Sequence, residues 1–451
     1  MNYTEIMTSD KLIKEKTIGV ISLGCDKNRV DTEKMLAVLG SDKITQDQEE
    51  AQIIIVNSCA FLESSRKEAI ETVFDVNELR KTGKLEKIVL TGCMPQKFVA
   101  DMFDEFKEVD VFLGTGDYEY LPEAIELAYK GKRVNFVGKA KEFKEKKRVV
   151  TTPLHYAYLK IADGCDNHCT YCLIPSIRGK YRSEKEEDLV AEAQSLGDVK
   201  ELILVAQDVT RYGEDIYGEN KFAELLRKLS ALDNIGSIRI LYCYPDKLTD
   251  ELIAEIKNND KIIKYLDIPL QHADPVVLKR MNRKGTGEGY LKLIAKLRKE
   301  IPDIAIRSTF IAGFPGETEE QFENLLEFIK EAKLTNAGFF AYSREEGTPA
   351  YRLPDQIDEK VKQSRVKKLY AAQKKVSEER NKSLVGKQIK VICDGVDYDK
   401  QSFYGRAYFS APEIDGKAYF TYDGEIQQGE YYNVKITKAD AYDLYGAATE
   451  V

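Results

Sequence analysis

The sequence predicts an α/β protein in three parts: an N-terminal open parallel α/β sheet, a central incomplete (β/α)6 barrel and a small C-terminal antiparallel β-barrel. Three observations predict it. Strand-like and helix-like segments alternate through residues 1–140 and again through 153–383. Residues 384–451 follow a period of two with no helical stretch. A chain of 451 residues also exceeds what one hydrophobic core usually holds.

The N-terminal part, residues 1–140, contains three apolar runs that each end at a cysteine and precede a helical pattern. The runs are Thr17–Leu23, Gln52–Val56 and Lys87–Leu90, and the helical patterns that follow the first two are Val30–Leu39 and Ser64–Leu79. Cys25, Cys59 and Cys93 are spaced 34 residues apart, close to the period of a βαβ unit. We therefore expect all three at the carboxyl edge of one parallel sheet, where ligands bind.

Residues 141–152 are expected to be a linker, because the chain from Lys139 to Arg148 is dominated by charged residues. Six strand-like runs follow in residues 153–383, each with a helical pattern after it. Six βα units rather than eight predict a barrel that does not close. The runs are Tyr156–Ala162, Glu201–Ala206, Ser237–Tyr244, Tyr265–Leu270, Ile304–Ile311 and Ala337–Tyr342.

The last part differs in character. A basic helical stretch, Val361–Lys382, leads into residues 384–451, which are rich in tyrosine and glycine. This pattern predicts about five short strands closed into a small barrel.

Composition narrows the function classes. The net charge of −8, from 68 basic and 76 acidic side chains, disfavours a protein held to nucleic acid mainly by phosphate contacts. No apolar run is long enough to span a bilayer, and the N-terminus lacks a signal-peptide core. We expect a cytoplasmic protein with no membrane partner. Eight cysteines and only three histidines then favour sulfur-based metal chemistry over disulfides or a histidine-rich zinc site.

Cys165, Cys169 and Cys172 form a CxxxCxxC motif just after the first expected barrel strand. A 4Fe–4S cluster usually takes four thiolates, so three closely spaced cysteines leave one iron open to a substrate or cofactor. Zinc binding or incidental buried thiols are the alternatives at this motif.

The CxxxCxxC motif resembles the signature of the radical S-adenosylmethionine (SAM) superfamily. The segment Leu173-Ile-Pro-Ser-Ile-Arg-Gly179 is similar to the methylthiotransferases, and four further segments resemble their RimO branch. One departure is Asp26, where proline is more usual; it affects the shape of a loop. The four segments are Ser22–Asn28, Asn57–Glu63, Phe340–Thr348 and Ser410–Gly416.

The resemblance covers the whole chain and implies a methylthiotransferase domain, a radical SAM barrel and a TRAM domain, which is an OB-like barrel. It implies two 4Fe–4S clusters, an auxiliary one on Cys25, Cys59 and Cys93 and one on Cys165, Cys169 and Cys172. It also implies SAM used twice, once to methylate sulfur at the auxiliary cluster and once to yield a radical. Both clusters must then flank one substrate carbon. No catalytic side chain is expected beyond the cluster ligands.

Other residues are candidates for contact with the cofactor, against the alternative of ordinary structural roles. By resemblance, Tyr171 lies near the adenine, and Gly313 and Gly316 belong to a glycine-rich cofactor loop. Near other strand ends, Gln207 and Gln271 are expected to bind ribose or substrate, and Arg307 the cofactor carboxylate. Further polar residues at these ends are Asp208 and His272. His168 is expected to shape the cluster loop, and Cys243 and Cys393 to be buried structural thiols.

RimO proteins add a methylthio group to the β-carbon of an aspartate in ribosomal protein uS12, whereas sister branches act on tRNA adenosines. Residues 384–451 carry seven basic and eleven acidic side chains, half of the chain's net charge. An acidic terminal barrel favours a basic protein partner, uS12 free or in the small subunit, over direct nucleic-acid contact. An electron donor such as flavodoxin or ferredoxin is also expected. The alternatives are a tRNA methylthiotransferase and a non-catalytic metal-stabilised RNA-binding or scaffold protein.

Overall fold

The computed structural model describes residues 13–40, 43–139, 141 and 147–450. The chain folds into two compact units. The first contains the chain up to Thr151 together with Lys160–Glu192 and Glu345–Thr348, and the second contains the remainder. The segment that carries Cys165, Cys169 and Cys172 therefore belongs to the same unit as the N-terminal sheet. The expected linker 141–152 lies partly outside the described residues.

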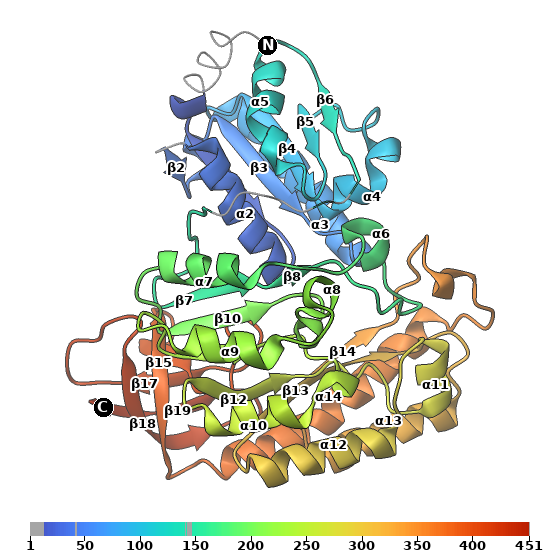
Figure 1. The fold of residues 1–451 in the computed structure, drawn as a ribbon, viewed down its shortest axis with the longest axis vertical. Coiled ribbons are helices and arrows are strands. Elements are labelled where there is room, and N and C mark those ends of the chain that lie inside the picture. Colours follow the sequence, from blue (N-terminus) through green and yellow to red (C-terminus); the bar gives the residue numbers. More distant parts are fainter. Residues whose placement is uncertain (1–12, 41–42, 140, 142–146, 451) are drawn as a thin grey trace. The chain divides into compact units, whose positions relative to one another are not determined.

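The first unit is built on a six-stranded parallel sheet in the order β2-β1-β3-β4-β5-β6 (Figure 1). The direction of winding reverses between β1 and β3, and in such sheets a ligand crevice opens at the carboxyl ends of the strands at this point. The strands are β1 (Ile18–Ser22), β2 (Ile44–Thr45), β3 (Ile53–Ser58), β4 (Lys87–Gly92), β5 (Val111–Leu113) and β6 (Val134–Phe136).

Helices cover both faces of this sheet. On one face α2 (Asp26–Leu39) and α5 (Leu121–Tyr129) pack against the sheet through one apolar cluster. On the other face, α3 (Glu63–Thr82) and α4 (Cys93–Met102) pack against the sheet through a second apolar cluster. Leu173 and Ile177, which follow the CxxxCxxC motif, belong to this apolar cluster. The sequence predicted β1, β3 and β4 but missed the short strands β2, β5 and β6.

Helix α2 buries much of its polar face. Asp31, Glu33 and Lys34 are each no more than 2% exposed. Glu33 pairs with Arg148 at 3.0 Å and Lys34 with Glu192 at 3.2 Å. These partnered charges join α2 to Lys160–Glu192, because a buried charge is tolerated only beside its counter-charge. That segment contains β8 (Ala162–Asp163), β9 (Arg182–Ser183), α6 (Ile174–Arg178) and most of α7 (Glu186–Ser195), whose last three residues belong to the second unit.

The second unit is built on a six-stranded sheet in the order β14-β13-β12-β11-β10-β7, with β10 to β14 parallel to one another. β7 and β14 lie at its two edges, so the described residues form the open six-stranded barrel that the sequence predicts. The last residue of β7, Lys160, belongs to the first unit. The strands are β7 (Tyr156–Lys160), β10 (Glu201–Val205), β11 (Ile238–Ile240), β12 (Ile262–Asp267), β13 (Ala305–Ala312) and β14 (Asn336–Ala341).

The helices of the second unit follow these strands in turn, and the long α14 packs along β14 (Figure 1). They are α8 (Glu214–Tyr217), α9 (Phe222–Ser230), α10 (Asp250–Asn258), α11 (Pro275–Arg280), α12 (Gly287–Glu300), α13 (Glu319–Ala332) and α14 (Glu359–Lys382).

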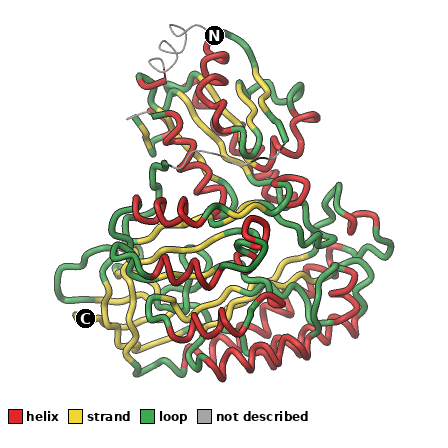
Figure 2. The backbone as a smooth tube through the Cα atoms, viewed as in Figure 1, coloured by secondary structure: helices red, strands yellow, loops and turns green. Residues whose placement is uncertain are grey.

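Five strands close the terminal segment into a barrel in the order β15-β16-β17-β19-β18, drawn as strand and loop in Figure 2. The prediction of a small barrel is confirmed, with one difference: β17 and β19 pair in parallel, whereas the other pairs are antiparallel. The strands are β15 (Gln388–Asp397), β16 (Ser402–Arg406), β17 (Ala418–Thr421), β18 (Tyr431–Ala439) and β19 (Leu444–Glu450).

Candidate functional site

Three cysteines follow the carboxyl ends of three neighbouring strands in the first unit. Cys25 comes three residues after β1 and caps α2, and Cys59 comes directly after β3. Cys93 comes directly after β4 as the first residue of α4. β1 and β3 are the strands at which the winding reverses, so this triplet lies at the crevice where such sheets bind ligands.

The loops that bear these cysteines converge on Asn28. Its Oδ1 lies 3.9 Å from the sulfurs of both Cys25 and Cys93. Its Nδ2 donates hydrogen bonds to the carbonyls of Leu23, at 3.0 Å, and Ser58, at 3.2 Å. One fully buried amide thus holds together the loops after β1 and β3.

Gly24 brings Cys59 into the same group. Its φ of 95° is unfavourable for residues with a side chain, and a Cβ there would lie 2.8 Å from the Cβ of Cys59. Only glycine lets the loop after β1 approach Cys59 so closely.

Two thiols of this triplet, those of Cys59 and Cys93, are hard to ionise without added positive charge. Burial raises the pKa of Cys93 to about 12, although the Arg178 guanidinium opposes the shift. Burial, followed by the neighbouring Cys25, also raises the pKa of Cys59. Converging cysteine sulfurs are the donor set that an iron–sulfur cluster uses, and its irons supply the positive charge that favours the thiolates.

Within the described residues, no group of three His, Cys, Asp or Glu side chains is placed to hold a single metal ion. The thiolates of an iron–sulfur cluster each bind a separate iron.

The second triplet lies on the loop between β8 and α6. The N–H of Cys165 donates to the carbonyl of Gly179 at 3.1 Å, and the N–H of Cys172 donates to the carbonyl of Cys169 at 3.0 Å. Two further backbone N–H groups donate to sulfur instead, that of Asn167 to Cys165 and that of Ile174 to Cys172. Such contacts stabilise thiolates and tune a cluster that they hold.

His168 and Tyr171 lie on the same loop. His168 adopts a left-handed φ of 49° and is exposed, which agrees with its expected role in shaping the loop. Tyr171, just before Cys172, is half-buried. Its contact with adenine remains a prediction.

Gln207 and Gln271 follow β10 and β12, as expected for groups that face a ligand. Gln271 has a positive φ of 71°, and its backbone bonds to Thr309 and Ile311 of β13. The carboxylate of Asp208 instead accepts hydrogen bonds from Thr210 and caps a short 3-10 helix. The two glutamines remain candidates for cofactor contact, whereas the contacts of Asp208 are structural.

The glycine-rich loop after β13 is held mainly by the protein itself. The carboxylate of Glu317 accepts the N–H groups of Gly313 and Phe314 and pairs with Arg365 at 2.8 Å. His272 is fully buried 3.4 Å from the same carboxylate. His272 therefore braces this loop.

Both glycines of this loop are required by packing. Gly313 and Gly316 have φ values near +75°, and a Cβ at either would collide with Lys362 or Arg280. Their predicted approach to a cofactor gains no support from these contacts.

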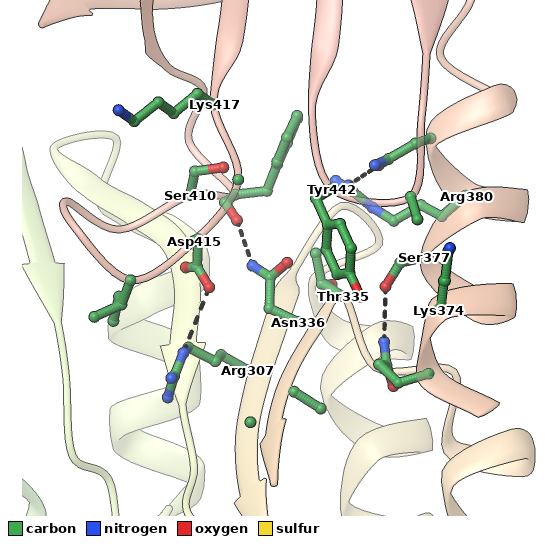
Figure 3. A pocket seen from close by; sticks show the side chains of 18 of the residues that line it. Arg307, Thr335, Asn336, Lys374, Ser377, Arg380, Ser410, Asp415, Lys417 and Tyr442 are labelled. Atoms are coloured by element: carbon green, nitrogen blue, oxygen red, sulfur yellow. Dashed lines mark hydrogen bonds and ion pairs between the residues drawn. The ribbon is translucent and has the colours of Figure 1, made fainter. Parts of the chain in front are cut away.

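Arg307 departs from the expected position. It is the third residue of β13, near the amino end of that strand, and it pairs with Asp267 at 3.0 Å and with Asp415 at 3.4 Å. With Asp415 it borders a cavity of about 300 Å³ between β14, α14 and the terminal barrel (Figure 3). The strand could be predicted from the sequence, but the groups that Arg307 meets could not, because they depend on how β13 is aligned with its neighbouring strands. The observed position of Arg307 lends no support to a contact with the cofactor carboxylate.

A buried polar group beside the first triplet was not predicted from the sequence. Arg178, on α6, pairs with Asp31 at 2.9 Å and with Asp163 at 3.0 Å. Lys160 bonds to the same two carboxylates. Arg178 lies in the Leu173–Gly179 segment that carries the family resemblance, and this was the available signal.

Cys243 and Cys393 are buried, as expected of structural thiols. No helix in the described parts of the chain is long and apolar enough to cross a bilayer.

Comparison with known proteins matches all three parts of the chain. The Radical SAM superfamily matches residues 159–329, the Uncharacterized protein family UPF0004 matches 17–114, and the TRAM domain matches 385–449. The curated "Ribosomal protein uS12 methylthiotransferase RimO" of Thermoanaerobacter sp. is 46% identical over 96% of this chain and 99% of its own length. Relatives of the same name from Lachnoclostridium phytofermentans and Clostridium botulinum are 47% and 45% identical, with similar coverage.

This chain belongs to the RimO methylthiotransferase family. It is therefore a radical SAM enzyme, and membership of the radical SAM superfamily implies a 4Fe–4S cluster and SAM. Solved structures confirm the fold class alone. The radical SAM methyltransferase TsrM from Kitasatospora setae aligns with a TM-score of 0.55 at 14% identity over 74% of this chain and 76% of its own. The cobalamin-dependent S-adenosylmethionine radical enzyme OxsB aligns with a TM-score of 0.53 at 13% identity, over 78% of this chain and 56% of its own.

Proposed function

We propose that this RimO-family enzyme transfers a methylthio group to the β-carbon of an aspartate in ribosomal protein uS12. The observation that carries the proposal is the pair of cysteine triplets, Cys25/Cys59/Cys93 and Cys165/Cys169/Cys172, in one chain that matches curated uS12 methylthiotransferases along nearly its whole length. The hydrogens of that carbon are not acidic enough for side-chain acid–base chemistry, so a cofactor must supply the reactivity.

The second triplet would hold the 4Fe–4S cluster that binds SAM, and the first triplet a second, auxiliary cluster. When bound, these groups supply one-electron cleavage of SAM, radical abstraction of hydrogen and a source of the methylthio group. The chain's own residues hold the ligands. The N–H groups of Asn167 and Ile174 stabilise the sulfurs of Cys165 and Cys172, and Asn28 fixes the loops of Cys25 and Cys59.

The cofactor contacts Tyr171, Gln207 and Gln271 remain part of this proposal, as do the domain boundaries 1–140, 141–152, 153–383 and 384–451. A cytoplasmic electron donor such as flavodoxin or ferredoxin would reduce the cluster. The enzyme would meet uS12 in the cytoplasm.

The acidic terminal barrel supports a basic protein partner by charge complementarity. One observation favours the alternative substrate, tRNA. Lys400, Lys417 and Lys438 lie over the rings of Tyr419, Tyr404 and Tyr445, respectively, and these tyrosines are neighbours on β16, β17 and β19. Proteins also hold single-stranded nucleic acid with basic side chains and with aromatic rings on which the bases stack.

Mass spectrometry of a strain that lacks this enzyme separates the two substrates. We expect the methylthio group to disappear from uS12 while tRNA modification stays unchanged. Loss confined to tRNA would contradict the proposal. A purified uS12 peptide, incubated anaerobically with the reconstituted enzyme, SAM and dithionite, should gain one methylthio group in place of one hydrogen.

A further inference from the structure

The guanidinium of Arg178 lies in the first unit between the two cysteine triplets. Arg178 is the last residue of α6, six residues after Cys172, and its side chain is only 2% exposed. Its two terminal nitrogens bind different groups. The planar guanidinium of arginine can bind two separate sets of partners in this way, whereas the single ammonium of lysine cannot reach both.

One nitrogen of the guanidinium contacts the Cys25/Cys59/Cys93 triplet and its surroundings. Nη2 donates to Asn28 Oδ1 at 2.6 Å and lies 3.8 Å from the sulfur of Cys93. The same Asn28 oxygen lies within reach of the Cys25 sulfur, and the Asn28 amide nitrogen holds the loops on either side of the crevice. Arg178 thus touches one cysteine directly and another through Asn28.

The other terminal nitrogen of Arg178 binds next to the loop that carries Cys165, Cys169 and Cys172. Nη1 binds Asp31 and Asp163, and Asp163 is two residues before Cys165. The carbonyl of the next residue, Gly179, accepts the N–H of Cys165. Gly164 permits this approach, because a Cβ there would lie 2.1 Å from the carbonyl oxygen of Lys180.

We propose that Arg178 is a positioning residue that fixes the two cysteine triplets relative to each other and places a positive charge beside the auxiliary cluster at Cys93. The inference rests on the proposed function, since it presumes that Cys25, Cys59 and Cys93 hold a cluster. A fixed positive charge beside a cluster ligand favours the reduced cluster. A lysine at position 178 would keep its single ammonium with Asp31 and Asp163 and lose the contact with Asn28 and Cys93, so reduction should become harder.

The test isolates the auxiliary cluster in the full-length chain with Cys165→Ala, Cys169→Ala and Cys172→Ala. Arg178→Lys is introduced into this parent and compared with Arg148→Lys. Arg148 is a matched control, because it is an equally buried arginine of the same unit and pairs with Glu33 and Glu192, at 3.0 and 2.9 Å. After anaerobic reconstitution, iron per chain is counted and the cluster is titrated with dithionite while its electron paramagnetic resonance (EPR) signal is followed.

We expect the parent and Arg148→Lys to bind about four irons at the same midpoint potential. Arg178→Lys should bind iron but require a more negative potential, with at least a tenfold lower ratio of reduced to oxidised cluster at a fixed potential, about 59 mV for one electron. Loss of iron from Arg178→Lys, with circular dichroism and melting temperature equal to those of Arg148→Lys, would also support the inference.

An unchanged potential and EPR signal in Arg178→Lys would overturn the role of Arg178 while leaving the auxiliary cluster intact. A parent that binds no iron would overturn the auxiliary cluster, and the inference with it. If Arg178→Lys does not fold, Asn28→Ala decides. It should retain less than half of the parent's iron, whereas Asn234→Ala, whose amide also bonds two backbone carbonyls, should retain all of it. Full iron in Asn28→Ala would then refute the inference.

Discussion

At the scale of single residues, the cysteine triplet of the N-terminal sheet depends on neighbours that carry no metal-binding group. Gly24 gives the loop after β1 a backbone conformation and a closeness to Cys59 that no other residue allows. Asn28 then holds that loop to the one after β3. The three sulfurs converge because Gly24 and the Asn28 amide bring the loops that carry them close together.

Gly24→Ala should therefore impair the site more than it impairs the fold. A positive φ alone costs alanine roughly 1–2 kcal/mol, and the contact with Cys59 must in addition displace that cysteine. We expect the reconstituted chain to lose about half of its iron, measured by chemical iron assay.

Gly197→Ala is the matched control for this substitution. Gly197 has a similarly left-handed φ of 73°, but nothing lies within 4 Å of a Cβ placed there. It should show the same backbone cost in thermal unfolding and full iron. Equal iron in both variants would show that the closeness of Gly24 to Cys59 is unimportant.

At the scale of elements, buried ion pairs join segments that the sequence alone would separate. Helix α2 binds the segment Lys160–Glu192 through Asp31, which pairs with Arg178, and Lys34, which pairs with Glu192. In the second unit, Glu201 of β10 pairs with Arg239 of β11 at 2.5 Å and with Arg406 of β16 at 2.8 Å. Each carboxylate is fully buried, so its contribution to stability depends on remaining ionised.

The Glu201 pairs predict how stability changes with pH. Burial alone would raise the pKa of Glu201, but Arg239 and Arg406 outweigh it and lower the pKa to about 2, against an ordinary value near 4.5. The unfolded chain therefore binds the proton first. The stabilisation, about 3 kcal/mol, is complete above pH 5 and is lost as pH falls towards 2.

Thermal unfolding between pH 3 and 7 checks this expectation. Glu201→Gln should flatten the acid side of the stability profile, at the cost of lower stability at pH 7. Glu430→Gln is the control, because its exposed pair with Lys200 at 3.0 Å contributes little. An acid slope that Glu201→Gln leaves unchanged would show that other carboxylates dominate.

At the scale of the whole molecule, the proposed function divides the chemistry between two cysteine triplets of one chain. Cys165, Cys169 and Cys172 would hold the cluster that cleaves SAM, and Cys25, Cys59 and Cys93 would hold the cluster that supplies the methylthio group. A chain that keeps Cys165, Cys169 and Cys172 but lacks the other triplet should still cleave SAM.

Replacing Cys25, Cys59 and Cys93 together by alanine should therefore halve the iron, from about eight to about four per chain. This variant should still form 5′-deoxyadenosine with dithionite but leave the uS12 peptide unmodified. Replacing Cys165, Cys169 and Cys172 should abolish both products. Chromatography of deoxyadenosine and mass spectrometry of the peptide measure the two steps. Methylthiolation by the first variant would contradict an auxiliary cluster.

Much of this protein could be predicted from its sequence. The 34-residue interval placed Cys25, Cys59 and Cys93 after parallel strands, and six βα repeats predicted an open barrel, because hydrophobic periodicity and strand order are local properties of the chain. The short strands β2, β5 and β6 were missed, since two or three residues carry too little periodic signal.

The sequence by itself determined the three-part architecture, both cysteine triplets and the family. Only the tertiary structure decided what surrounds them. Arg178 meets Asn28 and Cys93 across 150 and 85 positions of the chain, and no local pattern encodes such a meeting. The surroundings of Arg307 likewise follow from the pairing of distant strands, which places it beside Asp267 and Asp415. Ligand spacing is local in the chain, whereas charge pairing depends on how distant segments pack.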